Sequence, residues 1–248
     1  MPRSGARQRN LQVPLRGYDP LKLGTWLPMY KRICDDFGFD PEKDLRCAQL
    51  LGSMLGDDGT ECLKVVRKKF PESVLVCGGS PRLAEELSAL TIGGYVVAAD
   101  SATTVLAEAE IRPNMIVSDL DGIVEDQVEL NKEGTVVFVH AHGDNRDAIE
   151  RYLRDFRGPV VGTCQCVPPA GMYNFGGFTD GDRAACICAE LGAKKIHLAG
   201  FDFENPSEKT GKDREIKKRK LRWAKTILEE LAREGVEVLP ASDALGSL

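Results

Sequence analysis

The fold of this chain is decided by the stretch Arg112-Pro113-Asn114-Met115-Ile116-Val117-Ser118-Asp119-Leu120-Asp121-Gly122. Met115 to Val117 is a short apolar run after a Pro-Asn turn, which predicts a buried strand. If this strand continues to Asp121, its alternation places Asp119 and Asp121 on one face. Two carboxylates so close repel each other, so the pair predicts a bound cation, and oxygen ligands favour Mg²⁺ over zinc. The alternative is a polar Asp-Gly turn that caps the next helix.

Strand and helix patterns alternate on both sides of this stretch. The expected strands are 74–76, 95–99, 115–117, 136–139, 160–162, 195–199 and 236–239. Helical patterns fill most of the gaps, which predicts an α/β fold with a mostly parallel sheet and helices on both faces. Nearly every strand ends in Gly, Asp, Ser, His or Thr, so one ligand site is expected along the carboxyl edge of the sheet.

The rest of the chain divides by composition. Residues 1–16 contain four arginines, no acid and no apolar core, which predicts a flexible basic arm and not a secretory signal. Residues 17–70 predict a small helical N-terminal subdomain, whose second helix begins at Asp40-Pro41. No chemistry is identified in that subdomain. Residues 71–248 are expected to form the α/β domain, which would be the catalytic domain if the chain is an enzyme.

Composition and charge exclude several classes of protein. Charged residues make up 29% and hydrophobic residues 42% of the 248, and no run of about 18 apolar residues occurs, so no membrane helix is expected. The net charge of −5 argues against general nucleic-acid binding. Two CxC pairs, Cys164/Cys166 and Cys186/Cys188, leave a zinc site as an alternative. Reduced, buried cysteines in a cytoplasmic protein are the expected arrangement.

Glycines and an acid follow the first two strands of the expected sheet. The backbone N–H groups of Gly78, Gly79 and Ser80 could face an anion at the start of a helix, although a tight turn fits the same residues. Asp100 ends the next strand, where it is either a third metal ligand or a helix N-cap.

The segment after the fourth strand carries two histidines. His140, His142 and Asp144 are spaced as in a zinc triad, but such sites need further histidines, and the chain has only one more. Contact of His142 and Asp144 with phosphate or a hard metal is therefore the preferred interpretation. A helix cap formed by Asp144 and Asn145 is the alternative.

Two later segments complete the expected site. Residues 174–183 combine two aromatic rings with amide and carboxylate groups, a set that could stack on and hydrogen-bond a flat heterocycle. Their alternative is a loop in which Thr179 or Asp180 caps the next helix. Lys220 lies on the apolar stripe of a basic helix expected from about 212 to 234, where its charge needs an anion or solvent. We therefore expect Lys220 to bind phosphate.

These residues resemble those of a known family. Ala99-Asp100-Ser101-Ala102 together with 112–122 is similar to the nucleotide- and metal-binding part of thiamine pyrophosphokinases. The archaeal-type 6-hydroxymethyl-7,8-dihydropterin pyrophosphokinase, which shares that fold, is the closer resemblance and includes 37–40, 142–145 and 174–183. Two positions depart from the family pattern: the loop reads Gly-Gly-Ser-Pro-Arg, and Cys164 stands where threonine is usual.

The resemblance implies transfer of pyrophosphate from ATP to the pterin's hydroxymethyl oxygen, with release of AMP, in folate-like or methanopterin-type cofactor synthesis. The implied Mg²⁺ ligands are Asp119, Asp121, Asp100 and Asp144. Lys220 and His142 would steady developing charge, and Asp144 would accept the hydroxyl proton. The expected ATP contacts are Gly78, Gly79, Ser80, Asp100 and Lys220. The expected pterin contacts are Thr163, Gln165, Asn174, Phe175, Phe178, Asp180 and Asp182. The partners are small molecules, and a homodimer is compatible with the sequence.

Two other classes fit part of the pattern. Asp119-Leu120-Asp121-Gly122 also resembles the opening motif of haloacid-dehalogenase-type phosphatases, in which Asp119 would be the nucleophile. That motif belongs on the first strand, whereas two strands precede it here. A non-catalytic nucleotide- or sugar-binding module is the other class. Metal-suited acids and a basic helix on one chain argue against it.

Overall fold

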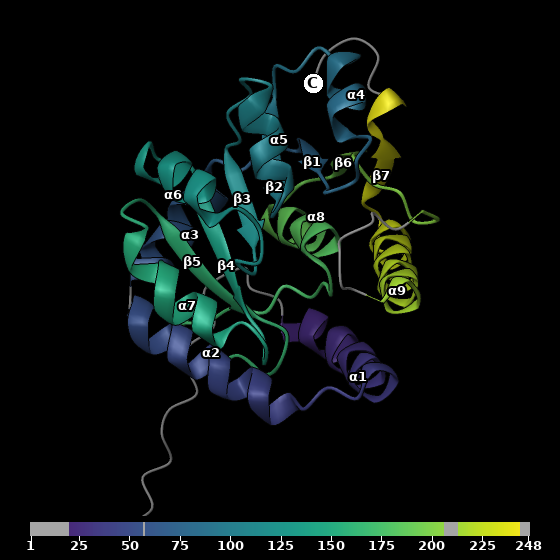
Figure 1. Ribbon diagram of the computed structural model, residues 1–248. Coiled ribbons are helices and arrows are strands. Elements are labelled where there is room, and N and C mark those ends of the chain that lie inside the picture. Colours follow the sequence, from purple (N-terminus) through teal and green to yellow (C-terminus); the bar gives the residue numbers. More distant parts are fainter. Residues whose placement is uncertain (1–19, 57, 206–212, 244–248) are drawn as a thin grey trace, which may run out of the picture.

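The computed structural model describes residues 20–56, 58–205 and 213–243 (Figure 1). Its strands form one seven-stranded sheet in the order β5-β4-β3-β2-β1-β6-β7, and each pair of neighbours is parallel. The predicted α/β fold is therefore confirmed, with a sheet that is parallel throughout. The predicted basic arm, 1–16, lies outside the described residues.

The strands form where the sequence has apolar runs. They are β1 Ser73–Cys77, β2 Tyr95–Ala99, β3 Met115–Ser118, β4 Val136–Ala141, β5 Val160–Cys164, β6 Lys195–Ala199 and β7 Glu237–Pro240. All four residues of β3 and the last four of β1 and β2 are buried. A parallel sheet covered on both faces buries successive residues, so its strands read as continuous apolar runs.

Helices cover both faces of the sheet (Figure 1). The helices after the first strands are α4 Leu83–Ser88, α5 Ala102–Glu108, α6 Val124–Lys132 and α7 Arg146–Tyr152. The last two helices are α8 Asp180–Leu191 and α9 Arg214–Arg233. Short 3₁₀ turns at Leu153–Asp155 and Ala241–Asp243 follow α7 and β7. α4, α5 and α6 pack side by side on one face, and α8 packs across β1, β2, β3 and β6 on the other, beside α9.

The direction of the connections changes at β1. Strands β2 to β5 succeed one another on one side of β1, whereas β6 and β7 lie on its other side. In an open parallel sheet, ligands bind beyond the carboxyl ends of the strands at such a switch. Gly78 and Gly200 follow β1 and β6 at this point. A Cβ on Gly78 would lie 2.7 Å from the carbonyl oxygen of Gly200, so only glycine permits this approach.

The N-terminal helices share the core of the sheet. They are α1 Pro20–Phe37, α2 Pro41–Leu55 and α3 Asp58–Lys68. Trp26, Ile33 and Leu51 belong to the same buried cluster as the strands, and α2 and α3 pack against β5. Asp40 caps α2 as predicted, because its carboxylate accepts the N–H of Glu42 at 3.0 Å. The predicted boundary near residue 70 thus falls between α3 and β1, but the helices have no core of their own.

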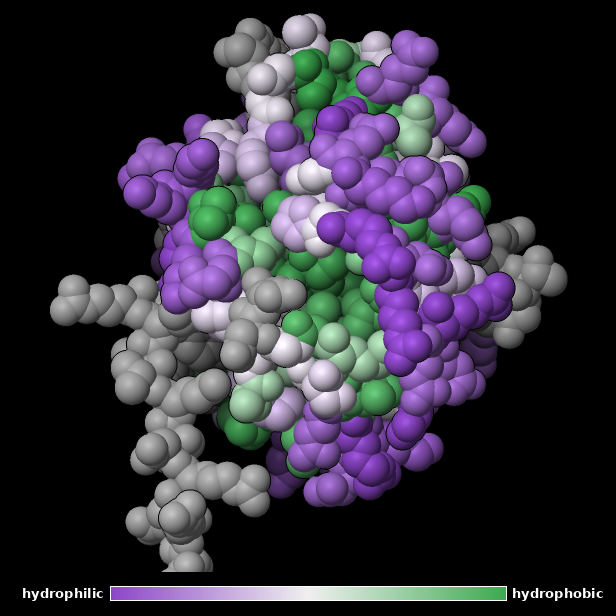
Figure 2. Space-filling view, turned by 90° about the vertical axis from the view of Figure 1, so that its left-hand side faces the viewer, coloured by the Kyte–Doolittle hydropathy of each residue, from purple (hydrophilic) through white to green (hydrophobic). Residues whose placement is uncertain are grey.

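Figure 2 shows the side of the molecule on which α2, α3 and α7 accompany the edge strand β5. Apolar side chains gather in the middle of this face, and hydrophilic ones lie beside them. Val65 of α3 and Val167 after β5 are among the large apolar side chains that stay exposed. Within the described ranges, no helix has the length and apolarity needed to cross a bilayer.

Candidate active site

One cavity of about 680 Å³ runs along the carboxyl edge of the sheet. Residues at or just after the ends of β1, β2, β3, β4, β5 and β6 line it. The start of α2, the loop before α8 and the middle of α9 complete its walls. Its volume is in the range of small-molecule sites, and it lies where ligands bind in such sheets.

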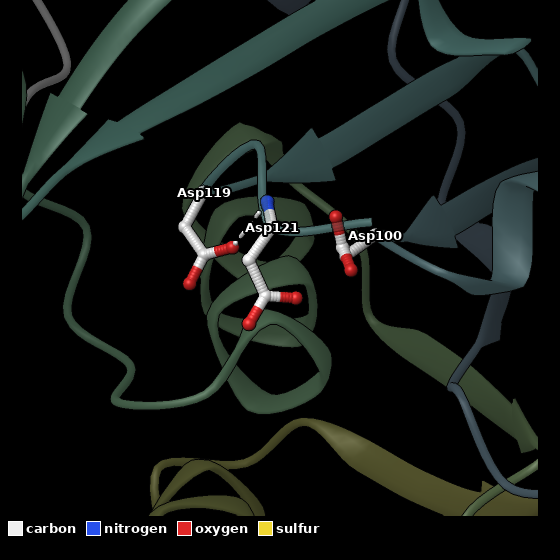
Figure 3. Close-up of side chains that lie close together, drawn as sticks. All are labelled: Asp100, Asp119 and Asp121. Carbon is white, nitrogen blue, oxygen red and sulfur yellow. Dashed lines mark hydrogen bonds between the residues drawn. The ribbon is translucent and has the colours of Figure 1, made fainter. Parts of the chain in front are cut away.

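Three carboxylates meet in this cavity, at the ends of β2 and β3 (Figure 3). One oxygen from each of Asp100, Asp119 and Asp121 lies within 4.8 Å of the other two. Asp100 is buried, Asp119 is half-buried and Asp121 is exposed. In the part of the chain that is described, no other group of His, Cys, Asp or Glu is arranged to hold a metal.

The CxC pairs do not form the alternative zinc site within that part of the chain. All eight cysteines are free, and all except the half-buried Cys62 are buried. Burial raises the pKa of Cys47 to about 11, which keeps that thiol protonated. These cysteines therefore pack as small apolar side chains, in line with the preferred interpretation of the sequence.

A tight turn brings Asp119 and Asp121 together. β3 ends at Ser118, and Leu120 adopts a left-handed φ of 65°. The N–H of Leu120 donates to the Ser118 hydroxyl at 2.9 Å, and the N–H of Asp121 donates to Asp119 Oδ1 at 3.2 Å. The strand does not continue to Asp121, so strand alternation is not what places the two acids together. The acids converge because the buried Leu120 side chain and these hydrogen bonds hold an unfavourable backbone conformation.

Asp100 is fixed from the sheet and from α6. Its Oδ1 accepts the Ser118 hydroxyl at 2.8 Å and Gln127 Nε2 at 3.2 Å. Its own N–H donates to the carbonyl of Val117 at 2.8 Å. Ser101, not Asp100, is the N-cap residue of α5. Of the two alternatives for Asp100, this placement favours the metal ligand.

Replacing Gly122 by alanine is expected to weaken cation binding. A Cβ at this position would lie 2.8 Å from Asp100 Oδ2, and the hydrogen bonds of Asp100 resist its displacement. We expect the dissociation constant for Mg²⁺, measured by calorimetry without other ligands, to rise about tenfold or more. Gly24→Ala is the matched control, because nothing lies within 4 Å of its added Cβ. An unchanged dissociation constant in Gly122→Ala would contradict this role of Asp100.

His142 orients Asp119. Its Nε2 lies 3.3 Å from Asp119 Oδ2, and its Nδ1 accepts the N–H of Asp144 at 3.3 Å. Since Nδ1 is an acceptor, the ring's proton is on Nε2, which donates to the carboxylate. Burial opposes the charge of Asp119, but His142 and the nearby Arg183 outweigh it and lower the pKa of Asp119. Asp144 is exposed and lines the cavity, outside the group of three carboxylates.

Asn145, considered from the sequence only as a helix cap, ties this region together. Its Nδ2 donates to the carbonyls of Asp119 at 2.8 Å and His140 at 2.6 Å. Its Oδ1 accepts the N–H of His142 at 3.0 Å and the thiol of Cys47 at 3.4 Å. Although Asn145 is the N-cap residue of α7, its side chain makes no capping bond. It joins the carboxylate turn, the loop after β4 and α2.

Asp182 is buried away from the cavity, contrary to the expectation that it faces the pterin. Its two carboxylate oxygens accept the N–H groups of Phe178 at 2.6 Å and Thr179 at 2.9 Å, and the Thr179 hydroxyl also bonds to it. Thr179 and Asp182 form the capping box of α8. Because its acceptor sites serve the helix start, Asp182 does not line the cavity.

Three other expected pterin contacts also lie outside the cavity lining. Asn174 donates to the carbonyl of Cys166 at 2.7 Å and is buried. The Phe175 ring belongs to the buried core. The hydroxyl of Thr163 lies 3.1 Å from Nδ1 of the buried His140. Polar residues of this region therefore stabilise the loop's own backbone and the sheet below it.

Phe178, Asp180 and Gln165 do line the cavity. Asp180 accepts Arg183 at 2.9 Å. Burial and the negative charge of Asp119 raise the pKa of Asp180, while the Arg183 guanidinium opposes that rise. Lys220 Nζ lies 5.7 Å from the centre of the Phe178 ring and also lines the cavity. The structure thus brings these residues together around the three carboxylates.

The glycine loop lines the cavity but uses part of its backbone internally. The N–H of Gly78 donates to the carbonyl of Ala199 at 2.8 Å, and that of Ser80 donates to the carbonyl of Gly200 at 3.0 Å. A Cβ on Gly79 would clash with the Ser101 hydroxyl. The loop therefore lets a ligand approach closely. The N–H groups of Gly78 and Ser80, however, already donate to backbone carbonyls.

The turn before α2 and the start of this helix supply cavity residues to which sequence reasoning gave no role, although the resemblance includes 37–40. Phe39 and Asp44 line the cavity, and Asp44 is only 4% exposed. Asp44 precedes Ala48 and Leu51, both fully buried, by four and seven residues, which places an acid on the apolar face of α2. An acid at an apolar position of the helical pattern was therefore the signal in the sequence that could have identified Asp44.

The sequence of this chain is similar to those of known proteins. Residues 52–208 match the family model described as 6-hydroxymethylpterin diphosphokinase MptE-like. Proteins named 6-hydroxymethyl-7,8-dihydropterin pyrophosphokinase from Methanothermobacter thermautotrophicus, Pyrococcus furiosus and Methanocaldococcus jannaschii are 41%, 40% and 34% identical to it. The alignments cover 87%, 87% and 88% of this chain and 97%, 96% and 98% of the relatives. This chain therefore belongs to the MptE-like family of 6-hydroxymethylpterin diphosphokinases.

Proposed function

We propose that this protein transfers pyrophosphate from ATP to the hydroxymethyl group of 6-hydroxymethyl-7,8-dihydropterin, with AMP as the second product. The observation that carries the proposal is the group formed by Asp100, Asp119 and Asp121 in a cavity that Lys220 also lines. The shared name of the three relatives supports the choice of the pterin as the substrate that receives pyrophosphate. The reaction would serve synthesis of a folate-like or methanopterin-type cofactor.

The carboxylates fit Mg²⁺. Asp100, Asp119 and Asp121 offer oxygen ligands only, within 4.8 Å of one another, and Mg²⁺ prefers such hard ligands. Together they would hold the ion at the ends of β2 and β3. Bound Mg²⁺ would neutralise and orient the phosphate oxygens of ATP.

The chain's own residues would position the two substrates. The hydroxymethyl oxygen attacks the β-phosphorus of ATP, and the bond from that phosphorus to the oxygen shared with the α-phosphorus breaks. AMP leaves with the electron pair, and the hydroxyl proton passes to a base, for which the exposed carboxylate of Asp144 at the cavity wall is our candidate. Lys220 would steady the phosphates, and His142 would keep Asp119 in place.

Product analysis tests the proposal directly. The protein is incubated with Mg²⁺, ATP and 6-hydroxymethyl-7,8-dihydropterin, and AMP, ADP and free phosphate are separated. AMP that forms only with the pterin supports the proposal. Phosphate release from small phosphomonoesters would support the phosphatase alternative, and nucleotide binding without turnover would support a binding module. The relatives' name gives no support to either alternative. The homodimer and the cytoplasmic location stay predictions.

Lys220→Ala is expected to raise KM for ATP about tenfold or to lower kcat, with little effect on pterin binding. Its ammonium group is at the cavity, and a lost charge-assisted hydrogen bond to phosphate costs roughly 1.5 to 3 kcal/mol. Lys218→Ala is the matched control, since Lys218 pairs with Glu215 at 3.2 Å and does not line the cavity. Equal losses in both variants would indicate a diffuse surface field and not a specific contact.

A further inference from the structure

The cavity differs chemically on the two sides of the three carboxylates. Toward β1 and β6 it is lined by the close backbone turns at Gly78 and Gly200, at the switch in strand order. Close backbone approach at a switch point suits a nucleotide and its phosphates. Toward β4 and β5 it is lined by Asp44, Gln165 and Gly143. A buried acid beside a buried amide suits an uncharged ring with polar edges.

Asp44 is the centre of a hydrogen-bond network that joins three elements. Its Oδ2 accepts Tyr30 Oη at 2.6 Å and Gln165 Nε2 at 2.7 Å, and its Oδ1 accepts the N–H of Gly143 at 2.6 Å. Burial, followed by the hydrogen bond to Asp44, raises the pKa of Tyr30, so the phenol stays protonated and acts as the donor. A carboxylate has about four acceptor sites, so Asp44 retains capacity for one more donor.

Gln165 places a donor beside that acceptor. An amide nitrogen carries two N–H groups, and the hydrogen bond to Asp44 uses one of them. Asp44 Oδ2 already accepts two hydrogen bonds, so the remaining acceptor site is on Oδ1, which among the described residues accepts only the N–H of Gly143. The pair therefore presents the cavity with this carboxylate oxygen as acceptor and with the second N–H of the Gln165 amide as donor. A lactam edge, with N–H and C=O on neighbouring ring atoms, is complementary to this arrangement.

Aromatic rings line the same cavity as the pair. Phe39, in the turn between α1 and α2, lines the cavity, and its ring centre is 6.3 Å from that of Phe178, which also lines it. Aromatic faces bind flat heterocycles by stacking. Gly143, bonded to Asp44, directly follows His142, whose ring bonds to Asp119. The loop after β4 would therefore contact the ring through Gly143 and its partner Asp44, and it contacts the three carboxylates through His142.

We infer that the pterin ring binds in this half of the cavity, with its lactam edge on Asp44 and Gln165 and its face against Phe39. The inference rests on the proposed function. It places the pterin on residues at or just before the start of α2 and just after β5. The switch point at β1 is left to ATP. Recognition is assigned to the lactam because its N–H and C=O are complementary to an acceptor and a donor side by side. An amidine held in the same orientation has its ring nitrogen as acceptor and its amino group as donor, which is the reverse order.

Equilibrium binding tests the site without turnover. Binding of the fluorescent 6-hydroxymethylpterin and of α,β-methylene-ATP is measured for Asp44→Asn, Phe39→Leu and Phe201→Leu. We expect the first two to weaken pterin binding about tenfold and to leave binding of the nucleotide analogue within about twofold. Phe201 directly follows Gly200 at the switch point and lines the cavity, so Phe201→Leu should show the reverse. Glu42→Gln, an exposed acid of α2 outside the cavity lining, is the control and should bind both ligands normally.

An analogue separates recognition from a structural role of Asp44. Near neutral pH, wild type should bind the 4-oxo ring about tenfold more tightly than 2,4-diamino-6-hydroxymethylpteridine, which lacks the lactam. Gln165→Leu should abolish this preference even if overall affinity changes little. Weaker pterin binding in Phe201→Leu, or normal pterin binding in both Asp44→Asn and Phe39→Leu, would overturn the site. If wild type forms no AMP with the pterin, the proposed function itself fails.

Discussion

Asp121→Asn is expected to reduce kcat/KM by about a thousandfold or more while the protein stays folded. Asp121 is the exposed member of the three carboxylates, and removing its charge weakens the hold on a cation that must offset the phosphates. The measurement is AMP formation at several Mg²⁺ concentrations. Glu125→Gln is the matched control, because Glu125 is an exposed acid in the first turn of α6 and does not line the cavity.

The stability of the same variant distinguishes a metal ligand from a structural acid. With no cation bound, Asp119 and Asp121 repel each other, so a neutral asparagine relieves repulsion. The backbone N–H of residue 121, which donates to Asp119, is unchanged by the substitution. We therefore expect the metal-free variant to melt no lower than wild type. Near-normal activity of Asp121→Asn at saturating Mg²⁺ would exclude the metal role.

The fold was predictable because its strands are buried on both faces. Met115 to Val117 and the equivalent runs are continuous apolar segments bounded by turn residues, and such segments identify parallel strands. Asp119 and Asp121 could be found for the same reason, since acids directly after a buried strand lie at its carboxyl edge. The path between them could not be predicted, because a leucine at φ 65° leaves no mark in the sequence.

The loop before α8 shows why polar residues alone do not locate a ligand. Thr179 and Asp182 have the three-residue spacing of a capping box, a signal that the sequence contains and that explains the burial of Asp182. Asn174 bonds a backbone carbonyl eight residues earlier, a pairing that only the folded loop shows. Conversely, Asp44 lies in a helix with no recognisable motif, and its role depends on Gly143 and Gln165, about a hundred residues away in sequence.

Substituting Asn145 can show whether this residue positions the carboxylates or only stabilises the fold. Asn131, on α6, is a matched residue, because it is also buried and its side chain bonds the carbonyls of Thr135 and Pro159 and the N–H of Gly158. It does not line the cavity. Alanine at either position leaves three backbone groups, one of them in a buried bond and two in partly buried bonds, without their partners. We expect each to cost on the order of 3 kcal/mol of unfolding free energy, or roughly 6 to 12 °C in Tm.

Only Asn145→Ala should also lose activity per folded molecule. Its amide holds the carbonyl of Asp119 and the N–H of His142, the two residues whose side chains bond to each other at the cation site. Without it, the carboxylates lose their fixed spacing, so the Mg²⁺ requirement should rise and kcat should fall about a hundredfold. Both variants are assayed well below their melting temperatures, with the folded fraction measured by circular dichroism. Equal activity losses in Asn131→Ala and Asn145→Ala would show that Asn145 acts through stability alone.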